Sequence, residues 1–313
     1  MSWISGRPGL SRRRTVTSAD AMDQPGAPTA AMPWRRFATR SSIVYWRRRS
    51  SNGSGEPPIV VLHGLASDHA GLREVIAGLG DRDVVAPDLP GHGQSSPLTH
   101  AHTVVAYADA VEELRTLLAA DSIILVGHSL GANIALTYAG LHPHRVNALG
   151  LLHPVSTATG LSARLGRAYY RIGSWLPQRL ARWWILSRPA VRLGDRLTVT
   201  TADRSRRRAI IEQDYRTAVM ASPRAIGEVY RSLLTTPFDY LASRVVAPTL
   251  IVTGSRDGFA RPASVRALHD LIPGSTLAVI HDAGHLWPVE DPAAAAQLVT
   301  STLLSSAPDH MVS

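Results

Sequence analysis

Short apolar segments alternate with helix-like segments along two stretches of this 313-residue chain, and this alternation constrains its fold more than any other feature. Seven segments have the length and apolar character of strands: residues 43–46, 59–62, 83–86, 122–126, 146–152, 249–253 and 276–280. Several are apolar throughout, as a sheet covered by helices on both faces requires. The pattern predicts an α/β fold with a mostly parallel sheet flanked by helices.

Helix-like patterns fill the gaps between the predicted strands. They cover residues 72–79, 104–119, 130–140, 262–271 and 292–303. Strands that alternate with helices predict crossover connections, which join parallel strands. Residues 52–55, Asn-Gly-Ser-Gly, are typical of a hairpin turn between the first two strands, so we expect the leading strand to be antiparallel.

The alternation is interrupted between the fifth and sixth predicted strands by a long helix-like stretch, residues 154–244. Because this stretch follows the carboxyl end of a core strand, it predicts a helical subdomain inserted over that edge of the sheet. The core then consists of residues 34–153 and 245–313. Residues 1–33 are rich in Arg, Ser, Ala, Pro and Gly, and they predict a poorly ordered basic arm.

The positive charge of the chain is unevenly distributed. The formal net charge is +9, and all 33 basic residues are arginine. Residues 1–50 hold ten arginines against two acidic residues, and residues 154–244 hold sixteen against six, whereas the rest of the chain is acidic. Exclusive use of arginine is better explained by genome composition than by a phosphate-binding surface. We therefore expect no nucleic-acid partner.

Composition also excludes several classes of protein. The chain has no cysteine, which removes disulfides, thiolate metal sites and a cysteine nucleophile. No apolar run reaches the roughly 18 residues that a membrane-spanning helix needs. Residues 11–14, Ser-Arg-Arg-Arg, resemble a twin-arginine export signal, but the polar, proline-broken stretch that follows lacks its apolar core. We expect a cytoplasmic protein, in peripheral contact with a membrane at most.

The most specific chemical signal is Gly127-His128-Ser129-Leu130-Gly131, which lies directly between a predicted strand and a predicted helix. This strand–turn–helix context is the one in which a nucleophile elbow presents its serine. The flanking glycines fit a turn too tight for a Cβ atom. The pattern indicates that Ser129 is a nucleophile rather than part of an ordinary Gly/Ser turn.

A serine hydroxyl needs a general base and an acid that orients the base. In a sheet of this kind the acid and the histidine follow later strands, in that order. Asp257 follows the sixth predicted strand and His285 follows the seventh. Asp257 is therefore the preferred acid, with Asp282 and Asp270 as alternatives. The backbone N–H groups of Leu65 and Leu130 are the candidate donors to an oxyanion.

These motifs together resemble the α/β-hydrolase superfamily over about residues 34–305. The resemblance rests on five motifs in the expected order: Leu62-His63-Gly64, residues 88–95 (Asp-Leu-Pro-Gly-His-Gly-Gln-Ser), residues 127–131, Asp257 and His285. The resemblance implies a Ser129–His285–Asp257 triad and a cap domain at about 154–244. It implies no metal and no organic cofactor.

The nucleophile narrows the class of reaction. Ser129 argues against epoxide hydrolases and haloalkane dehalogenases of this fold, which use an aspartate. Leu130 argues against prolyl aminopeptidases, which carry tryptophan after the serine. We expect a serine hydrolase that cleaves a small-molecule carboxylic ester or thioester through an acyl-enzyme intermediate. Carbon–carbon bond hydrolysis, cofactor-free perhydrolysis and non-catalytic binding of a small ligand are the alternatives.

Several residues are candidates for lining a substrate pocket between the core and the predicted insert. They are either large aromatic residues of the insert or residues near the catalytic loops: His63, His128, His153, Trp183, Trp184 and Trp287. We expect the insert's aromatic residues to form the roof of an apolar acyl pocket.

Arginines of the predicted insert fall on common helical faces. One face carries Arg164, Arg167 and Arg171, and another carries Arg179 and Arg182. Next to large aromatic residues, such faces suit contact with an anionic membrane surface. They equally suit recognition of an acidic acyl carrier such as coenzyme A. The third interpretation is a solvated surface.

Overall fold

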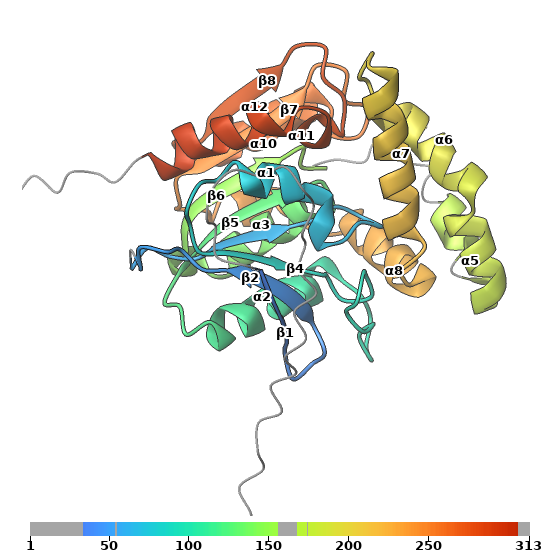
Figure 1. Cartoon of the computed structure of the whole chain (residues 1–313), viewed down its shortest axis with the longest axis horizontal. Coiled ribbons are helices and arrows are strands. Elements are labelled where there is room, and N and C mark those ends of the chain that lie inside the picture. Colours follow the sequence, from blue (N-terminus) through green and yellow to red (C-terminus); the bar gives the residue numbers. More distant parts are fainter. Residues whose placement is uncertain (1–33, 54, 156–167, 174, 306–313) are drawn as a thin grey trace, which may run out of the picture.

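The computed structural model describes residues 34–53, 55–155, 168–173 and 175–305 (Figure 1). Its centre is an eight-stranded sheet in the order β1-β2-β4-β3-β5-β6-β7-β8. The strands are β1 (Arg35–Ala38), β2 (Val44–Arg48), β3 (Ile59–Leu62), β4 (Val84–Pro87), β5 (Ile123–His128), β6 (Val146–Leu152), β7 (Thr249–Gly254) and β8 (Thr276–Ile280). All pairings from β4 to β8 are parallel, as the sequence predicts.

The antiparallel edge of the sheet differs from the prediction in one respect. Strand β2 is antiparallel, but it pairs with β1 and β4 and not with β3. The predicted hairpin between β2 and β3 is therefore wrong. Both sides of β3 are taken by its parallel neighbours β4 and β5. The sequence analysis also missed β1, an exposed edge strand whose residues Arg-Arg-Phe-Ala lack an apolar pattern.

Helices cover both faces of the sheet because neighbouring strand residues point to opposite sides. One face carries α2 (Val104–Leu117), α3 (Leu130–Leu141), α9 (Phe238–Ala242) and α10 (Pro262–Leu271). The other carries α1 (Arg73–Ala77), α11 (Trp287–Glu290) and α12 (Pro292–Val299), with a 3₁₀ turn at residues 69–72 and a π turn at residues 300–304. A further 3₁₀ turn, residues 143–145, joins α3 to β6. In β3, Val60 and Leu62 pack on the first face, while Ile59 and Val61 pack on the second.

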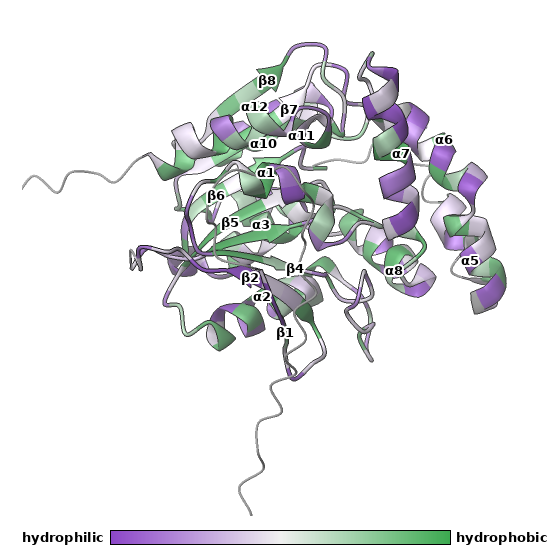
Figure 2. Ribbon diagram, viewed as in Figure 1, coloured by the Kyte–Doolittle hydropathy of each residue, from purple (hydrophilic) through white to green (hydrophobic). Residues whose placement is uncertain are grey.

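In the described part of the chain after β6, residues 168–173 are helical, and they are followed by α5 (Gln178–Leu186), α6 (Arg188–Thr198), α7 (Arg204–Ala218) and α8 (Pro223–Leu233). We call the described residues 168–173 and 175–236 the insert. Figure 1 shows α5, α6 and α7 together at one end of the molecule. The insert has a small apolar cluster of its own that includes Ile185, Ala218 and Ile226. Figure 2 shows the apolar strands of the sheet and the mixed polarity of these helices.

The last part of the predicted insert belongs to the core. Helix α9 packs against α3, and its residues Phe238 and Leu241 join the main core cluster. A Cβ on Gly140 would lie 2.6 Å from the carbonyl oxygen of Leu241, so the glycine permits this close approach. Within the described residues no helix combines the length and apolar character needed to cross a bilayer. Residues 1–33, Arg164 and Arg167, which carried several of the predictions, lie outside the described part.

Candidate active site

Ser129 lies on a sharp turn between β5 and α3. Its backbone has φ 53° and ψ −117°, a strained conformation for a residue other than glycine. The turn is possible only because residues 127 and 131 are glycines. A Cβ on Gly127 would lie 2.2 Å from the carbonyl oxygen of Gly131. A Cβ on Gly131 would lie 2.3 Å from the carbonyl oxygen of Leu62. The geometry is that of a nucleophile elbow.

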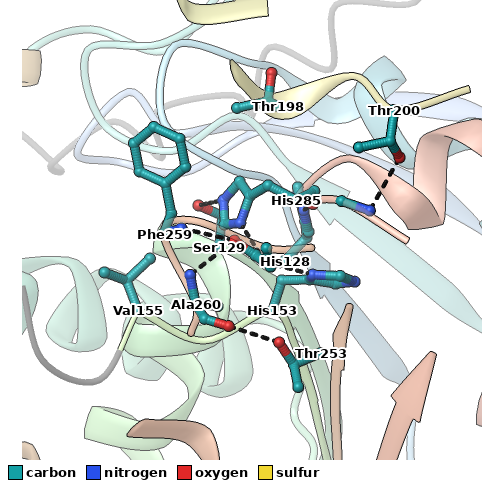
Figure 3. A network of polar contacts seen from close by, with 12 residues as sticks. His128, Ser129, His153, Val155, Thr198, Thr200, Thr253, Phe259, Ala260 and His285 are labelled. Carbon is teal, nitrogen blue, oxygen red and sulfur yellow. Dashed lines mark hydrogen bonds and ion pairs between the residues drawn. The ribbon is translucent and has the colours of Figure 1, made fainter. Parts of the chain in front are cut away.

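Ser129, His285 and Asp257 form a continuous chain of hydrogen bonds (Figure 3). The Ser129 hydroxyl donates to His285 Nε2 at 2.8 Å. On the other side of the ring, His285 Nδ1–H donates to Asp257 Oδ2 at 2.8 Å. This arrangement gives the imidazole the tautomer in which Nε2 can accept the serine proton.

Asp257 is buried and fully hydrogen-bonded. Its Oδ1 accepts the backbone N–H groups of Phe259 and Ala260, each at 2.8 Å. Thr253 donates to the Ala260 carbonyl at 2.6 Å, which holds this loop against the end of β7 (Figure 3). Burial alone would raise the pKa of Asp257, but the charge of His285 and the hydrogen bonds from two histidines outweigh burial and hold the pKa well below its usual value. The carboxyl is therefore ionised at neutral pH.

The two alternative acids lie elsewhere. The side chain of Asp282 is 56% exposed and pairs with Arg256 at 2.8 Å. Asp270 is exposed on α10. The structure thus places Asp257, and neither alternative, in contact with His285.

The candidate oxyanion donors come from two separate loops. Leu65 and Leu130 both line the same cavity as Ser129. Leu130 is the first residue of α3, and N–H groups in the first turn of a helix have no acceptor within the helix. No hydrogen bond from the Leu65 N–H to another described residue is present.

A cavity of about 340 Å³ opens above Ser129. Core residues form its floor, among them Ser129, Leu130, Phe259 and His285. Its roof comes from the insert: Tyr170, Gly194, Asp195, Thr198, Gln213, Asp214, Thr217, Ala218, Tyr230, Leu233 and Leu234. The volume is in the range of small-molecule sites.

Two carboxyl groups of the roof, Asp195 on α6 and Asp214 on α7, hydrogen-bond to each other. Burial raises the pKa of Asp195 to about 6, opposed by Asp214 and Arg192. Burial and the neighbouring Asp195 raise the pKa of Asp214 to about 7. Near neutral pH the pair therefore holds one shared proton, with Asp214 as the donor.

The tryptophans predicted to form the roof do not line this cavity. Trp183 is 68% exposed, because the buried face of α5 is formed by Ala181 and Ile185. Trp184 stacks on Tyr169 with ring centroids 5.5 Å apart, and its Nε1–H donates to the Tyr169 carbonyl. The aromatic groups of the insert that do line the cavity are Tyr170 and Tyr230, whose rings are 4.3 Å apart.

Three further predictions for the pocket are corrected by the structure. His63 is buried beside Leu89, whose N–H it accepts at Nε2, while its Nδ1–H donates to the Gly64 carbonyl. Trp287 is buried in the core beneath the sheet. His153 is fully buried at the end of β6, where it contacts Asp257 instead of the cavity.

His128 does line the cavity, as predicted. Its Nε2–H donates to the His285 carbonyl at 2.9 Å. Burial, together with the nearby His285 and His153, lowers the pKa of His128 to about 3, so the ring is neutral. His128 therefore supports the backbone of the histidine loop without adding charge.

The insert is fastened directly to the loop that carries His285. The Thr200 hydroxyl accepts the Gly284 N–H at 3.0 Å (Figure 3). The same hydroxyl donates to Glu290 at 2.9 Å. The Leu286 N–H donates to the Thr198 carbonyl at 3.3 Å. These contacts make the position of His285 depend on the segment that joins α6 to α7.

His153, Asp257 and His285 also form a set of potential metal donors within 4.8 Å of one another. Both Nδ1 atoms lie at hydrogen-bond distance from one carboxylate oxygen, 2.7 and 2.8 Å. The second oxygen already accepts two backbone N–H groups. We therefore interpret the cluster as a hydrogen-bond network.

The sequence analysis missed the residues that give the cavity its polarity. The pairing of Asp195 with Asp214 had no local signal, because the two residues lie on different helices. Thr200 likewise carries no motif. Tyr230 is partly buried on α8 and also belongs to no sequence motif.

The fold and the hydrogen-bonded Ser129–His285–Asp257 chain define the class of protein. The chain matches the family described as alpha/beta hydrolase fold over residues 57–292. This span covers most of the chain and includes all three residues. The protein belongs to the α/β-hydrolase family, which confirms the resemblance seen in the sequence.

The chain is also similar to individual proteins. An uncharacterised protein of Mycobacterium tuberculosis (strain H37Rv) is 29% identical over 276 residues, which cover 84% of this chain and 79% of the relative. A thermophilic esterase from Thermogutta terrifontis has a TM-score of 0.71 at 22% identity and covers 87% of this chain and 98% of its own. The enol-lactonase from Burkholderia xenovorans LB400 has a TM-score of 0.73 at 19% identity, covering 87% of this chain and 100% of its own. At these identities the two structures show a shared fold.

Proposed function

We propose that this protein is a serine hydrolase that cleaves a carboxylic ester or thioester through an acyl-enzyme intermediate. The observation that carries the proposal is the 2.8 Å hydrogen bond from the Ser129 hydroxyl to His285 Nε2 at the floor of a substrate-sized cavity. Ser129, His285 and Asp257 then act as a catalytic triad. The esterase and enol-lactonase of the same fold support this class of reaction.

The proposed reaction has two steps. Ser129 Oγ attacks the carbonyl carbon while His285 Nε2 takes its proton, and the backbone N–H groups of Leu65 and Leu130 stabilise the oxyanion. His285 then returns the proton to the leaving alcohol or thiol. In the second step water attacks the acyl-enzyme, again with His285 as the base, and the acid is released. Asp257 remains ionised and stabilises the imidazolium.

We also propose that residues 154–244, apart from α9, act as a cap that closes the acyl pocket. The support is that α6, α7 and α8 all contribute residues to the cavity wall opposite Ser129. Leu65 and Ala66, on the core side, pack against the apolar cluster of the insert. The preference for one acyl chain over another should therefore depend on residues of the insert. Tyr170 and Tyr230 take the place of Trp183 and Trp184 as the aromatic residues of the pocket roof.

The test is a fluorophosphonate probe applied to wild-type protein, Ser129→Ala and Ser67→Ala, because Ser67 lines the same cavity. We expect labelling of the wild-type and Ser67→Ala proteins and none of Ser129→Ala. The kcat on a cleavable ester should fall by about 10⁴-fold or more in Ser129→Ala. Absence of labelling in folded wild-type protein would favour a non-catalytic ligand binder.

A panel of aryl esters, acyl-CoA thioesters, vinylogous diketones and peracid formation from hydrogen peroxide separates the reactions open to this fold. We expect turnover of the esters or thioesters to exceed turnover of the diketones and peracid formation. A preference for a diketone would point to carbon–carbon bond hydrolysis, and rapid peracid formation would point to a perhydrolase.

We further propose that the exposed face of α5 contacts an anionic membrane surface, with the protein otherwise in the cytoplasm. Leu180 and Trp183 are 52% and 68% exposed, and the exposed Arg179 lies one turn from Trp183. Just before α5, Trp175 is 72% exposed, and the Arg171 guanidinium lies 5.4 Å from its ring. Exposed aromatic residues among arginines are typical of interfacial helices.

Sedimentation with phosphatidylcholine vesicles, with and without phosphatidylglycerol, tests this surface. We expect binding only to the anionic vesicles, and weakening with salt because exposed charges are screened over about 10 Å at 0.1 M. Trp183→Ala with Leu180→Ala should abolish binding, whereas Tyr240→Ala, at a 60% exposed residue on α9, should not. Binding that is absent at low salt, or unchanged in the α5 variant, would make these residues ordinary surface. Cell fractionation tests the location.

A further inference from the structure

Asp257 Oδ2 accepts hydrogen bonds from two histidines at once. His285 Nδ1 lies 2.8 Å from this oxygen, and His153 Nδ1 lies 2.7 Å from it. The reaction proposed above uses only the first of these bonds. The second joins residues that are 104 positions apart in the chain.

The fold brings His153 to this place for a simple topological reason. Strands β5, β6, β7 and β8 are consecutive neighbours in the sheet and parallel to one another. Ser129, His153, Asp257 and His285 each follow one of these strands, so all four lie at the same edge. His153 therefore occupies the strand end between the nucleophile and the acid.

His153 is held rigidly. Its φ is +54°, an uncommon value for a residue with a side chain, and its N–H donates to the Val252 carbonyl at 2.7 Å. The side chain is completely buried, with the Trp287 ring 6.2 Å away. A strained, buried residue next to catalytic groups indicates a functional constraint.

The charge state of His153 follows from its surroundings. Burial lowers the pKa of His153 despite its bond to Asp257, so the ring is neutral. A neutral ring that bonds a carboxylate through Nδ1 carries its proton there and donates it. No described group hydrogen-bonds to the other ring nitrogen, Nε2, which is buried.

This donor has two consequences for His285. It fixes the rotation of the Asp257 carboxyl, because each oxygen now has its own set of donors. It also withdraws negative charge from the oxygen that faces the His285 ring, which weakens the stabilisation of the imidazolium formed during the reaction. The titratable groups that face the His285 ring in the described structure are Asp257, His153 and the neutral His128.

We propose that His153 is a positioning residue that orients Asp257 and moderates the charge of the carboxylate oxygen that His153 and His285 share, through a hydrogen bond to that oxygen. The inference rests on the proposed serine-hydrolase function. It assigns to His153 a role in setting the pH range in which the enzyme is active.

The test compares His153→Leu, which removes the donor, with His153→Asn, whose amide nitrogen can donate from nearly the position of Nδ1. His92→Phe is the matched control, because His92 is equally buried but bonds to the Pro90 carbonyl. The readouts are the pH profile of kcat/KM and the pH dependence of fluorophosphonate labelling. Circular dichroism verifies that each variant is folded.

In His153→Leu we expect kcat to fall about 10-fold, since Asp257 is less well oriented. The acidic limb of the pH profile should move upward by about 0.5–1 pH unit, because Asp257 Oδ2, without its second donor, stabilises the imidazolium more strongly. His153→Asn should restore most of both effects, and His92→Phe should show neither. A purely structural role would lower activity without moving the acidic limb.

Two outcomes would overturn the inference: an unmoved acidic limb in folded His153→Leu, or no recovery in folded His153→Asn. Failure of the proposed function itself looks different, because wild-type protein would then neither hydrolyse esters nor react with the probe.

Discussion

The Thr200 hydroxyl accepts a hydrogen bond from the backbone N–H of Gly284, the residue that precedes His285. This contact joins the segment between α6 and α7 to the histidine loop. A Cβ on Gly284 would lie 2.4 Å from Thr200 Cγ2, so Thr200 packs directly against Gly284 and leaves no room for a side chain there. The insert therefore supports the loop of His285, the proposed catalytic base, as well as covering the cavity.

Replacing Thr200 by valine tests this support. Thr200→Val removes the acceptor for Gly284 and the donor to Glu290 while keeping the shape of the side chain. We expect kcat to fall about 3- to 10-fold with a smaller change in KM, because a misplaced base affects chemistry more than binding. Thr235→Val, at an exposed threonine of the insert, is the control. Equal effects of the two variants would contradict the coupling.

The identity of the acid is tested by Asp257→Asn beside Asp282→Asn. The first should lower kcat by about 10⁴-fold, because the amide no longer stabilises the imidazolium or fixes its tautomer. The second should change kcat less than twofold, since Asp282 is exposed and asparagine tolerates its positive φ of 55°. Steady-state kinetics on one ester measures both. Comparable losses would mean that the acid was misassigned.

Acyl-chain preference should follow the tyrosines of the cavity roof. Tyr230→Ala enlarges the pocket beside Tyr170 and should raise kcat/KM for long-chain relative to short-chain p-nitrophenyl esters, by about 5-fold or more. Trp183→Ala should leave this ratio unchanged because Trp183 is exposed. An altered ratio in Trp183→Ala alone would show that the roof is arranged differently.

The Asp195–Asp214 pair predicts a pH-dependent stability. Both pKa values are raised in the folded state, by burial first and, for Asp214, by the neighbouring carboxylate. Acids with raised pKa values contribute stability that is present below their unfolded pKa near 4 and is lost as pH rises through the folded values, about 6 and 7.

Asp214→Asn cannot ionise and should avoid that loss. We expect the Tm of the variant, relative to wild type, to be higher at pH 8 than at pH 5. The difference should amount to several degrees, because one pKa unit corresponds to about 1.4 kcal/mol. Asp109→Asn, at an exposed residue of α2, provides the comparison. A Tm difference that is the same at both pH values would refute the shared-proton description.

Much of this molecule was predictable from its sequence because the signals are local. The elbow at Ser129 is recognisable in the sequence from Gly127 and Gly131, because a Cβ atom at either position would clash with the backbone. The strands β3 to β7 appear as apolar runs because both faces of the parallel sheet are covered there. The order of Ser129, Asp257 and His285 along the chain then indicates the site, since parallel strands end at one edge.

Other features depended on contacts between segments that are distant in sequence. Strand β2 pairs with β4 rather than with the strand next in the chain. The rotation of α5, which turns Trp183 outward and leaves the cavity to Tyr170 and Tyr230, is set by how Ala181 and Ile185 pack against the rest of the insert. A helical pattern gives the faces of a helix, but packing decides which face is covered.

His285 and His153, which both hydrogen-bond to Asp257, also differ in how far the sequence predicts their roles. The sequence by itself determined that His285 follows the last strand of the sheet, as the base of a serine nucleophile should. It gave His153 no such role, because that role arises from the adjacency of β6 and β7 and from a hydrogen bond across 104 residues. Short motifs therefore identify the residues expected to react. The hydrogen bond that connects His153 to Asp257 forms only after folding, when the sheet brings the ends of β6 and β7 together.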